Sequence, residues 1–364
     1  MATNLPSSAL GYRPALDGIR AVAVIAVLAG HSGWMSGGFL GVDVFFALSG
    51  FLITSLLLDE FDARGTIALS LFYARRALRL LPALSLFLVV CTGITLSTVP
   101  PEFGPLALQQ AAVVAFYIAN WAWAFGLSTG ILGHTWSLAI EEQFYLLWPL
   151  ALFGILRLGV RRGIILGVTL AGITVGVLWR MVMVQTGASL LHVHQGTDTH
   201  GDALLIGCAA ALAVRMTSSW IRGVGWASAA VLVTLFTGAT FPDDYLYRHA
   251  STVTAAVSAV LIIDIVQRPK SWLGRGFAAQ PLAALGRMSY GVYLWHFPVF
   301  FYCGALAYAG ATPAPWPAHA VAWGTTMAAA ILSYVALERP ILAFKATVRP
   351  ASVAVRAGLI AKEA

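Results

Sequence analysis

Long apolar stretches separated by short polar turns make up most of the chain. Most of them reach the roughly 20 residues that a helix needs to cross a bilayer. The eleven stretches lie at 18–34, 39–58, 81–99, 107–125, 138–156, 163–184, 203–217, 224–241, 250–267, 285–309 and 318–338. This pattern predicts an all-α fold, a polytopic integral membrane helix bundle.

The stretch 107–125 differs from the others because it contains Gln109, Gln110 and Asn120. A re-entrant segment enters the membrane and returns on the same side, and its backbone is buried against protein. We therefore predict about ten transmembrane helices and one re-entrant segment.

Basic residues predict the orientation of the bundle, since lysine and arginine mark the cytoplasmic ends of membrane helices. With 107–125 re-entrant, all basic clusters fall on one side. They are Arg13 and Arg20; Arg64, Arg75, Arg76 and Arg79; Arg157, Arg161 and Arg162; Arg215 and Arg222; Arg268, Lys270 and Arg275; and Arg339, Lys345, Arg349 and Arg356. We predict a multi-pass protein of the inner or plasma membrane with both termini cytoplasmic.

One transmembrane domain is expected over residues 1–345, followed by a short basic tail at 346–364. Residues 1–17 lack the features of a removable signal peptide, so the first span is expected to serve as its own insertion signal. The sequence does not specify the oligomeric state.

Composition narrows the possible partners. Hydrophobic residues make up 59% of the chain and charged residues 10%, against about 25% charged in a soluble domain. The net charge of +7 predicts no nucleic-acid partner, because the basic residues stand in short segments where membrane orientation explains them. We expect membrane lipid to surround the protein. Cys91, Cys208 and Cys303 show neither metal-ligand spacing nor a disulfide pattern.

The first span carries an arginine near its start and a histidine near its end. Arg20 and His31 are about three helical turns apart and share one face, with only apolar residues and glycine between them. Ionisable groups at membrane depth are expensive, so a histidine there is expected to have a function. The alternative is an interfacial histidine that is satisfied by water.

Two arginines, Arg76 and Arg79, stand one turn apart at the start of the third stretch. Arginine pairs bind phosphates in a bidentate manner, which lysine cannot do. The pair therefore predicts phosphate recognition. Its alternative is an ordinary topology signal.

The segment from His134 to Pro149 is the most specific in the chain. Ser137, Glu141 and Tyr145 recur every four residues and line one helical face, with Glu142 about 100° away. At least one of the two carboxylates is expected to meet a histidine or an arginine and to orient an imidazole, as in a catalytic triad. A carboxylate that caps the helix start is the alternative.

A fourth group joins the long polar turn to a late helix. It combines Asp198, His200 and Asp202 with Tyr290, Tyr293 and His296. His192, His194 and His200 could suggest zinc, but no His-Glu-x-x-His helix accompanies them, and no metal is expected. The sequence also lacks the serine elbow, Walker loop and Rossmann fingerprint of hydrolases, ATPases and dinucleotide enzymes.

At these residues the chain resembles the acyltransferase family 3 membrane proteins, over nearly its whole length. The shared motifs are the arginine and histidine at Arg20 and His31, GVDVFF-x-LSGFLIT at 41–54, the arginines at Arg76 and Arg79, SL-x-x-EEQFY at 137–145, and SY-x-x-YL-x-H-x-P at 289–298. One departure is His200, where relatives usually have arginine. Relatives often also carry a secreted-side esterase-like domain, which is not expected in this chain.

The resemblance implies transfer of an acyl group, commonly acetyl, from acyl-coenzyme A to a hydroxyl of an envelope glycan or of a macrolide-like secondary metabolite. The residues suit this reaction, with His31 as general base oriented by Glu141 or Glu142, and with Arg20, Arg76 and Arg79 for coenzyme A. Direct transfer is expected rather than a covalent acyl-enzyme. Candidates for substrate or oxyanion contacts are Asp17, Ser137, Tyr145, Asp198, His200, Asp202, Tyr290, Tyr293 and His296.

Two other functions remain open at this point. A transporter, or a lipid- or sugar-binding bundle, would use the same polar residues to line a path, although the two halves of the chain show no duplication. A membrane acyltransferase with a lipid or carrier-protein donor is the second alternative.

Overall fold

The computed structural model describes residues 11–216, 223–238, 244–307 and 314–345. The predicted tail at 346–364 lies outside these ranges, as do Arg222, Arg349 and Arg356. Within the described ranges the chain forms helices and no strand. The prediction of an all-α membrane bundle is thus confirmed.

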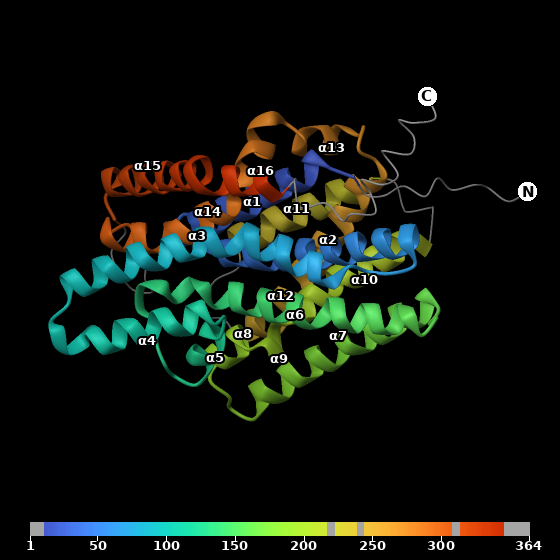
Figure 1. The fold of residues 1–364 in the computed structure, drawn as a ribbon, viewed down its shortest axis with the longest axis horizontal. Coiled ribbons are helices and arrows are strands. Elements are labelled where there is room, and N and C mark those ends of the chain that lie inside the picture. The colour runs from blue at the N-terminus through green and yellow to red at the C-terminus, as the bar shows by residue number, and fades with distance from the viewer. Residues whose placement is uncertain (1–10, 217–222, 239–243, 308–313, 346–364) are drawn as a thin grey trace, which may run out of the picture.

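The long helices run roughly along the longest axis of the molecule (Figure 1). They are α1 (Pro14–His31), α2 (Gly41–Arg64), α3 (Leu69–Thr98), α6 (Trp136–Arg157), α7 (Arg162–Gln185), α10 (Asp202–Met216), α11 (Val224–Gly238), α12 (Asp244–Gln267), α14 (Gln280–Tyr302) and α15 (Trp316–Ser333). The short helices are α4 (Gly104–Ala115), α5 (Ala119–Ala124), α8 (Leu190–Gln195), α9 (Thr197–His200), α13 (Trp272–Phe277) and α16 (Arg339–Lys345). Single 3₁₀ or π turns occur at Gly38–Leu40, Pro101–Phe103, Gly130–Thr135 and Tyr334–Glu338.

Seven helical segments of the described residues are long and apolar enough to cross a membrane. They are Pro14–His31, Gly38–Arg64, Leu69–Thr98, Gly130–Arg157, Arg162–Gln185, His249–Gln267 and Trp316–Ile341. The other three expected spans form α10, α11 and α14, of which α10 and α11 have 15 residues each. Each apolar stretch assigned to a span therefore has its own helix.

The stretch 107–125 forms no continuous helix. It divides into α4, with 12 residues, and α5, with 6, and each is shorter than the roughly 20 residues of a span. At the break, Tyr117 has a φ of 54°, a conformation that non-glycine residues seldom adopt. Gln143 of α6 stabilises the break, because its amide donates to the Tyr117 carbonyl (2.8 Å) and to Asn120 (2.9 Å). This geometry fits the predicted re-entrant segment.

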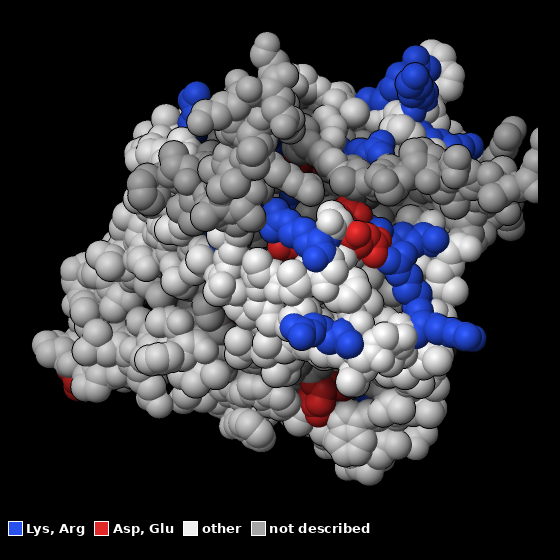
Figure 2. All heavy atoms as spheres, turned by 45° about the vertical axis from the view of Figure 1, so that its right-hand side comes forward, with Lys and Arg blue, Asp and Glu red and all other residues white. Residues whose placement is uncertain are grey.

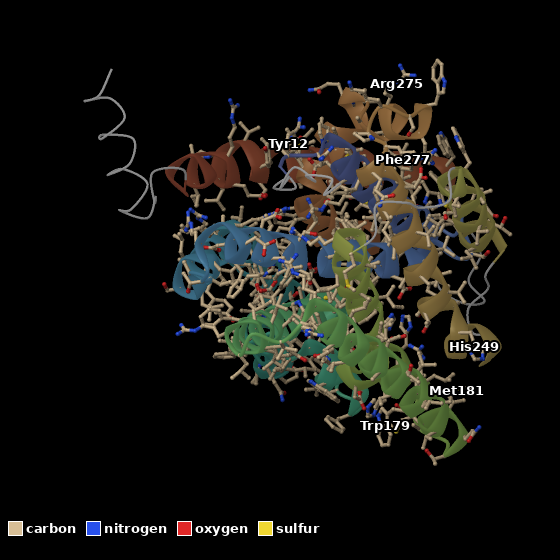
Figure 3. All side chains as sticks on the ribbon, turned by 90° about the vertical axis from the view of Figure 1, so that its right-hand side faces the viewer. Tyr12, Trp179, Met181, His249, Arg275 and Phe277 are labelled. Carbon is tan, nitrogen blue, oxygen red and sulfur yellow. The ribbon has the colours of Figure 1, made fainter. Side chains whose placement is uncertain are left out.

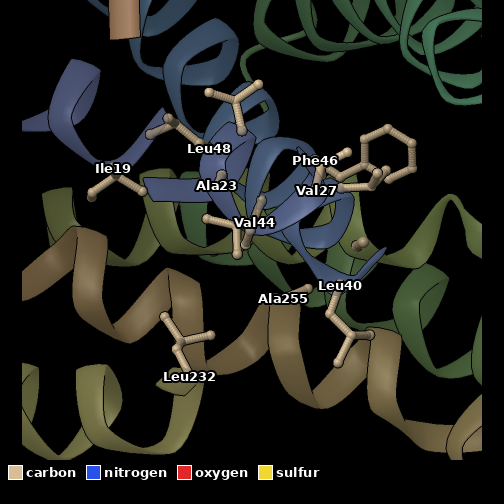
Figure 4. Close-up of a cluster of buried hydrophobic side chains, with 14 of the residues drawn as sticks. Ile19, Ala23, Val27, Leu40, Val44, Phe46, Leu48, Leu232 and Ala255 are labelled. Atoms are coloured by element: carbon tan, nitrogen blue, oxygen red, sulfur yellow. The ribbon is translucent and has the colours of Figure 1, made fainter. Parts of the chain in front are cut away.

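Helices α1, α2 and α12 form the centre of the bundle, whereas α3, α6, α7 and α15 cover it. More than 60% of the residues in the apolar windows of the central three are buried, against 17–28% in the outer four. Figure 4 shows part of the central apolar cluster, including Ile19, Val27 and Phe46. The polar side chains of the central helices are therefore held in fixed surroundings.

Small residues let the central helices touch backbone to backbone. A Cβ on Gly286 of α14 would lie 1.8 Å from the Asp17 carbonyl oxygen of α1, and one on Gly207 of α10 would lie 2.0 Å from the Ala47 oxygen of α2. No larger residue fits at either contact without moving a helix. These contacts fix α14 on α1 and α10 on α2.

Charged side chains tie several helix ends together at one end of the bundle. Arg162 and Arg215 both bind Asp62, and Arg215 also binds Asp59. Blue basic side chains gather over the corresponding face in Figure 2, with acidic ones among them. The ends of α2 and α10 and the start of α7 therefore meet at a common basic surface.

Candidate functional site

A cavity of about 270 Å³ lies between α1, α2, α3, α6 and α14. It brings together most of the residues that the sequence motifs singled out. Its polar lining consists of Arg20, Ser49, Arg76, Arg79, Tyr117, Ser137, Glu141, Glu142, Tyr145, Ser289, Tyr290 and Tyr293. Residues from five helices, far apart in the sequence, thus form one chamber together with Tyr117 at the break between α4 and α5.

Arg76 is bound to the carboxylates of α6. Its Nε donates to Glu142 Oε2 at 3.0 Å and its Nη2 binds Glu142 Oε1, while Glu141 Oε1 lies 3.7 Å away. The guanidinium carbon also stands 3.1 Å from the centre of the Tyr145 ring. A carboxylate that meets an arginine was expected. Because Arg76 is already paired, it is less available to a phosphate than predicted.

Arg79 lines the same cavity but differs from Arg76 in its contacts. Its side chain is exposed and forms no ion pair within the described residues. Arg20 is held by Asp17, with 3.1 Å between Nη1 and Oδ1. Three arginines and two glutamates line the cavity, so it carries a net positive charge when all are ionised. An anion in the cavity could therefore bind Arg79 without displacing an ion-pair partner among the described residues.

Hydroxyl groups close the cavity at one side. Ser137 Oγ and Tyr293 Oη lie 2.6 Å apart, and the tyrosine also donates to the His134 carbonyl at 2.9 Å. Ser49 donates to Glu141 Oε1 at 2.6 Å. Tyr290 binds the Leu80 carbonyl at 3.3 Å.

Behind this hydroxyl pair stand three histidines, His31, His134 and His296, which we call the histidine cluster. The rings of His31 and His296 are 5.0 Å apart between centroids, and those of His134 and His296 are 5.1 Å apart. None of the three lines the cavity. Tyr293 touches both sides, because its ring lies 5.3 Å from that of His296.

The predicted pairing of His31 with Glu141 or Glu142 is wrong. His31 Nδ1 instead lies 3.1 Å from the Val27 carbonyl and 3.3 Å from His296 Nε2. The carboxylates bind Arg76 and Ser49, since these partners on α3 and α2 are nearer to them. A histidine thus occupies the position expected for a carboxylate.

Hydrogen bonds assign the protons of this pair. His296 Nδ1 is 2.6 Å from the Tyr293 carbonyl and must donate to it. In neutral His296, Nε2 is then an acceptor, and it faces the Nδ1 of His31. A proton on His31 Nδ1 leaves Nε2 as the unprotonated nitrogen, which is the one that can accept a proton.

His134 was not among the predicted site residues. Its Nε2 donates to the Leu294 carbonyl at 3.1 Å, and its Nδ1 is buried without a partner among the described residues. The signal was its position one turn before Ser137 in the most specific motif.

Asp198, His200 and Asp202 lie away from Tyr290, Tyr293 and His296, so the fourth predicted group does not assemble. His200 Nε2 binds Asp43 at 2.6 Å. Asp198 accepts from Trp179 at the edge of the bundle (Figure 3) and contacts His192.

Asp202 makes two 3.0 Å bonds to Arg180, and both side chains are buried. Asp43 and Arg180 were missed, although each is a charged residue in an apolar stretch, which is a recognisable signal.

The histidines of the 186–201 turn have contrasting protonation behaviour. Burial would lower the pKa of His200, but the charge and hydrogen bond of Asp43, together with Asp202, raise it above its ordinary value. Burial, and then the positive charges of His200 and Arg180, lower the pKa of His194 to about 3. His200 is therefore part of a buried ion-pair network that joins α2 to the turn.

Fold and site together define a polytopic helical membrane protein with a cationic chamber beside a cluster of histidines. A protein-family model described as an acyltransferase domain matches residues 13–338. The chain belongs to this acyltransferase family, as its motifs indicated.

Several curated relatives are O-acetyltransferases by name. The chain is 35% identical over 311 residues to the peptidoglycan O-acetyltransferase OatA of Listeria monocytogenes, covering 79% of this chain and 49% of the relative. It is 36% identical over 326 residues to the O-acetyltransferase OatA of Staphylococcus aureus, covering 83% and 53%. The chain thus spans about half the length of the curated relatives it matches. No solved structure matches it.

Proposed function

We propose that this protein is a membrane O-acyltransferase that moves an acetyl or other short acyl group from acyl-coenzyme A to a hydroxyl of a cell-envelope glycan. The observation that carries the proposal is the cationic cavity, whose wall includes Tyr293, a residue in ring contact with His134 and His296 of the histidine cluster. It supports a donor site and a proton-accepting site on either side of one point of transfer.

The donor would enter from the basic end of the bundle. Arg79, with Arg20 beside it, would bind the phosphates, because Arg76 is occupied by Glu142. Arg76 is then a positioning residue that holds Glu142 and Tyr145 in the wall. The acyl arm would pass along the apolar side chains of α2, including Phe45 and Leu52, towards Ser137 and Tyr293.

Transfer would be direct. His31 Nε2 takes the proton of the acceptor hydroxyl, whose oxygen attacks the thioester carbonyl. The carbon–sulfur bond then breaks, and the imidazolium returns the proton to the coenzyme A thiolate. Tyr293 and Ser137 would exchange their mutual bond for bonds to the developing oxyanion. A bundle interior poor in water would protect the thioester from hydrolysis.

A glycan is the favoured acceptor because one relative is named as a peptidoglycan O-acetyltransferase. A secondary metabolite remains the second candidate. Both acceptors would be acylated on a hydroxyl by the same chemistry, so a transfer assay with each acceptor decides between them.

Purified protein in lipid nanodiscs, given acetyl-coenzyme A and a glycan fragment, tests the proposal. We expect free thiol to be released only when the acceptor is present, with ester formed on the acceptor. If free acyl-coenzyme A never supports turnover but a lipid or carrier-protein donor does, the donor assignment is wrong. Acyl transport without any ester product would favour the transporter alternative.

The proposed orientation places the basic end, with both termini, on the cytoplasmic side. Single cysteines in a background without Cys91, Cys208 and Cys303 test it with an impermeant reagent. Position 160, in the turn between α6 and α7, should be protected in intact cells. Labelling from outside would invert the assignment from residue 137 onward.

A further inference from the structure

Three tryptophans form a stack just beyond His31. Trp34 lies 5.6 Å from Trp316 and 5.5 Å from Trp323 between ring centroids, at interplanar angles of 21° and 8°. Trp316 and Trp323 are seven residues apart on α15, about 10.5 Å along a helix. Together the two stacking distances are about equal to this interval, so Trp34 is inserted between the other two rings.

The backbone after α1 fixes the position of Trp34. Gly33 has a φ of +75°, and the Trp34 amide donates to the Ala29 carbonyl at 2.9 Å. Such a left-handed turn reverses the chain at the helix end, and glycine is the residue that adopts it at least cost. Trp34 is thereby held three residues from His31.

The stack is joined directly to the site. Trp323 Nε1 donates to Ser32 Oγ at 3.0 Å, and Ser32 is the neighbour of His31. Beside Trp34, the His319 ring lies 5.1 Å away, 3% exposed, and its Nδ1 has no partner in the described part of the chain. A polar group without a partner next to exposed aromatic rings is typical of a place where a polar ligand binds.

Exposure increases along the stack away from Ser32. Trp34 is 49% exposed and Trp316 is 69% exposed, and the outer ring face belongs to Trp316. Tryptophans of a membrane-interface belt are anchors that stand at headgroup level around the protein. These three are stacked on one another and bound inward to Ser32, so their arrangement is that of a rigid ligand platform.

We propose that Trp316, supported by Trp34 and Trp323, is a subsite for a sugar ring of the glycan acceptor. It rests on the proposed function for the identity of that acceptor. The apolar face of a pyranose ring stacks on the outer face of the Trp316 indole, while the hydroxyls of the sugar stay in water. Carbohydrate is favoured over lipid because the platform is flat, carries a buried polar nitrogen and adjoins the proposed base.

The position of the platform sets a length requirement. Trp316 lies two helical turns, about 10 Å, further out than the Trp323–Ser32 bond. One sugar cannot both stack on Trp316 and present a hydroxyl to His31. The platform therefore selects oligomeric acceptors over monosaccharides.

Binding of a chitotetraose probe in the absence of donor tests the platform independently of transfer. We expect calorimetry to show tetramer binding by purified protein in nanodiscs and weaker binding of N-acetylglucosamine. Trp316→Ala should weaken tetramer binding about two- to tenfold, as loss of an aromatic contact does. Trp316→Tyr should restore most of it.

Trp272→Ala is the matched control, since Trp272 is 79% exposed on α13 and outside the stack. Tetramer binding unchanged in Trp316→Ala would overturn the inference and leave the stack as an interfacial anchor. Tetramer binding that depends on Trp316 in a protein without transferase activity would support the subsite while the proposed function fails.

Discussion

Two histidine-centred pairs in this molecule differ in the group that faces the imidazole. His200 faces the carboxylate of Asp43 at 2.6 Å, whereas His31 faces another imidazole, His296, at 3.3 Å. A carboxylate stabilises the protonated ring, and it raises the pKa of His200. An imidazole can fix the tautomer of its neighbour without adding negative charge. The first pair is therefore suited to hold helices together and the second to accept a proton.

The largest expected effect is on the rate of acyl transfer, and it should differ between the two histidine pairs. Losing a general base removes about 10²–10⁴ in rate, so His31→Ala should fold and bind donor but transfer at least about a hundredfold more slowly. His200→Gln should transfer at nearly the parent rate in protein that remains folded. Steady-state turnover with saturating acetyl-coenzyme A measures both. Near-normal turnover in His31→Ala together with loss in His296→Ala would move the base to α14.

A smaller loss of transfer rate is expected when His31 is kept and only the imidazole that faces its Nδ1 is removed. His296→Phe keeps an aromatic ring but removes one of the two acceptors near His31 Nδ1, leaving the Val27 carbonyl, and such second-layer partners are typically worth about 10–100-fold. Because the two residues act as a unit, the double variant with His31→Ala should be no slower than His31→Ala alone. Independent, multiplying losses would show that His296 acts separately.

Donor affinity should respond to the cavity and not to either histidine pair. A charge-assisted bond contributes about 1.5–3 kcal/mol, so Arg79→Ala should weaken coenzyme A binding about tenfold or more. Arg75→Ala is the matched control, since Arg75 stands on the same helix and does not line the cavity. Calorimetry on both variants decides the assignment, and equal affinities would refute it.

The smallest expected effect concerns stability and not the rate of transfer. The Asp43–His200 pair should make the free energy of unfolding depend on pH. The folded-state pKa of His200 is raised above the ordinary value of about 6.5. Its contribution to the free energy of unfolding is therefore complete below that value and is lost as the pH rises through the raised pKa. The difference in Tm between the parent and His200→Gln should be largest near pH 5 and should shrink towards pH 9. A constant difference would contradict the ion pair.

The helices and most of the cavity were predictable from the sequence, and the pairings were not. Hydrophobic stretches located each of the long helices, and motif spacing placed Ser137, Glu141 and Tyr145 on one face, which lines the cavity. The partner of His31 was unpredictable because it lies on α14, 265 residues away. Which helix packs on α1 depends on contacts such as Gly286 on Asp17, which leave no periodic pattern. His200 was placed in the wrong group because its partner, Asp43, is hidden in an apolar motif.

The contact between Gly286 and the Asp17 carbonyl has a genetic consequence. Gly286 precedes His296 by ten residues, about three turns of a stiff helix. A methyl group at position 286 would push this end of α14 away from α1. The resulting tilt of α14 would separate the imidazoles of His31 and His296, although the methyl group contacts neither. In a screen for inactive alleles, substitutions at this glycine should therefore appear beside those at the histidines, in proteins that still reach the membrane.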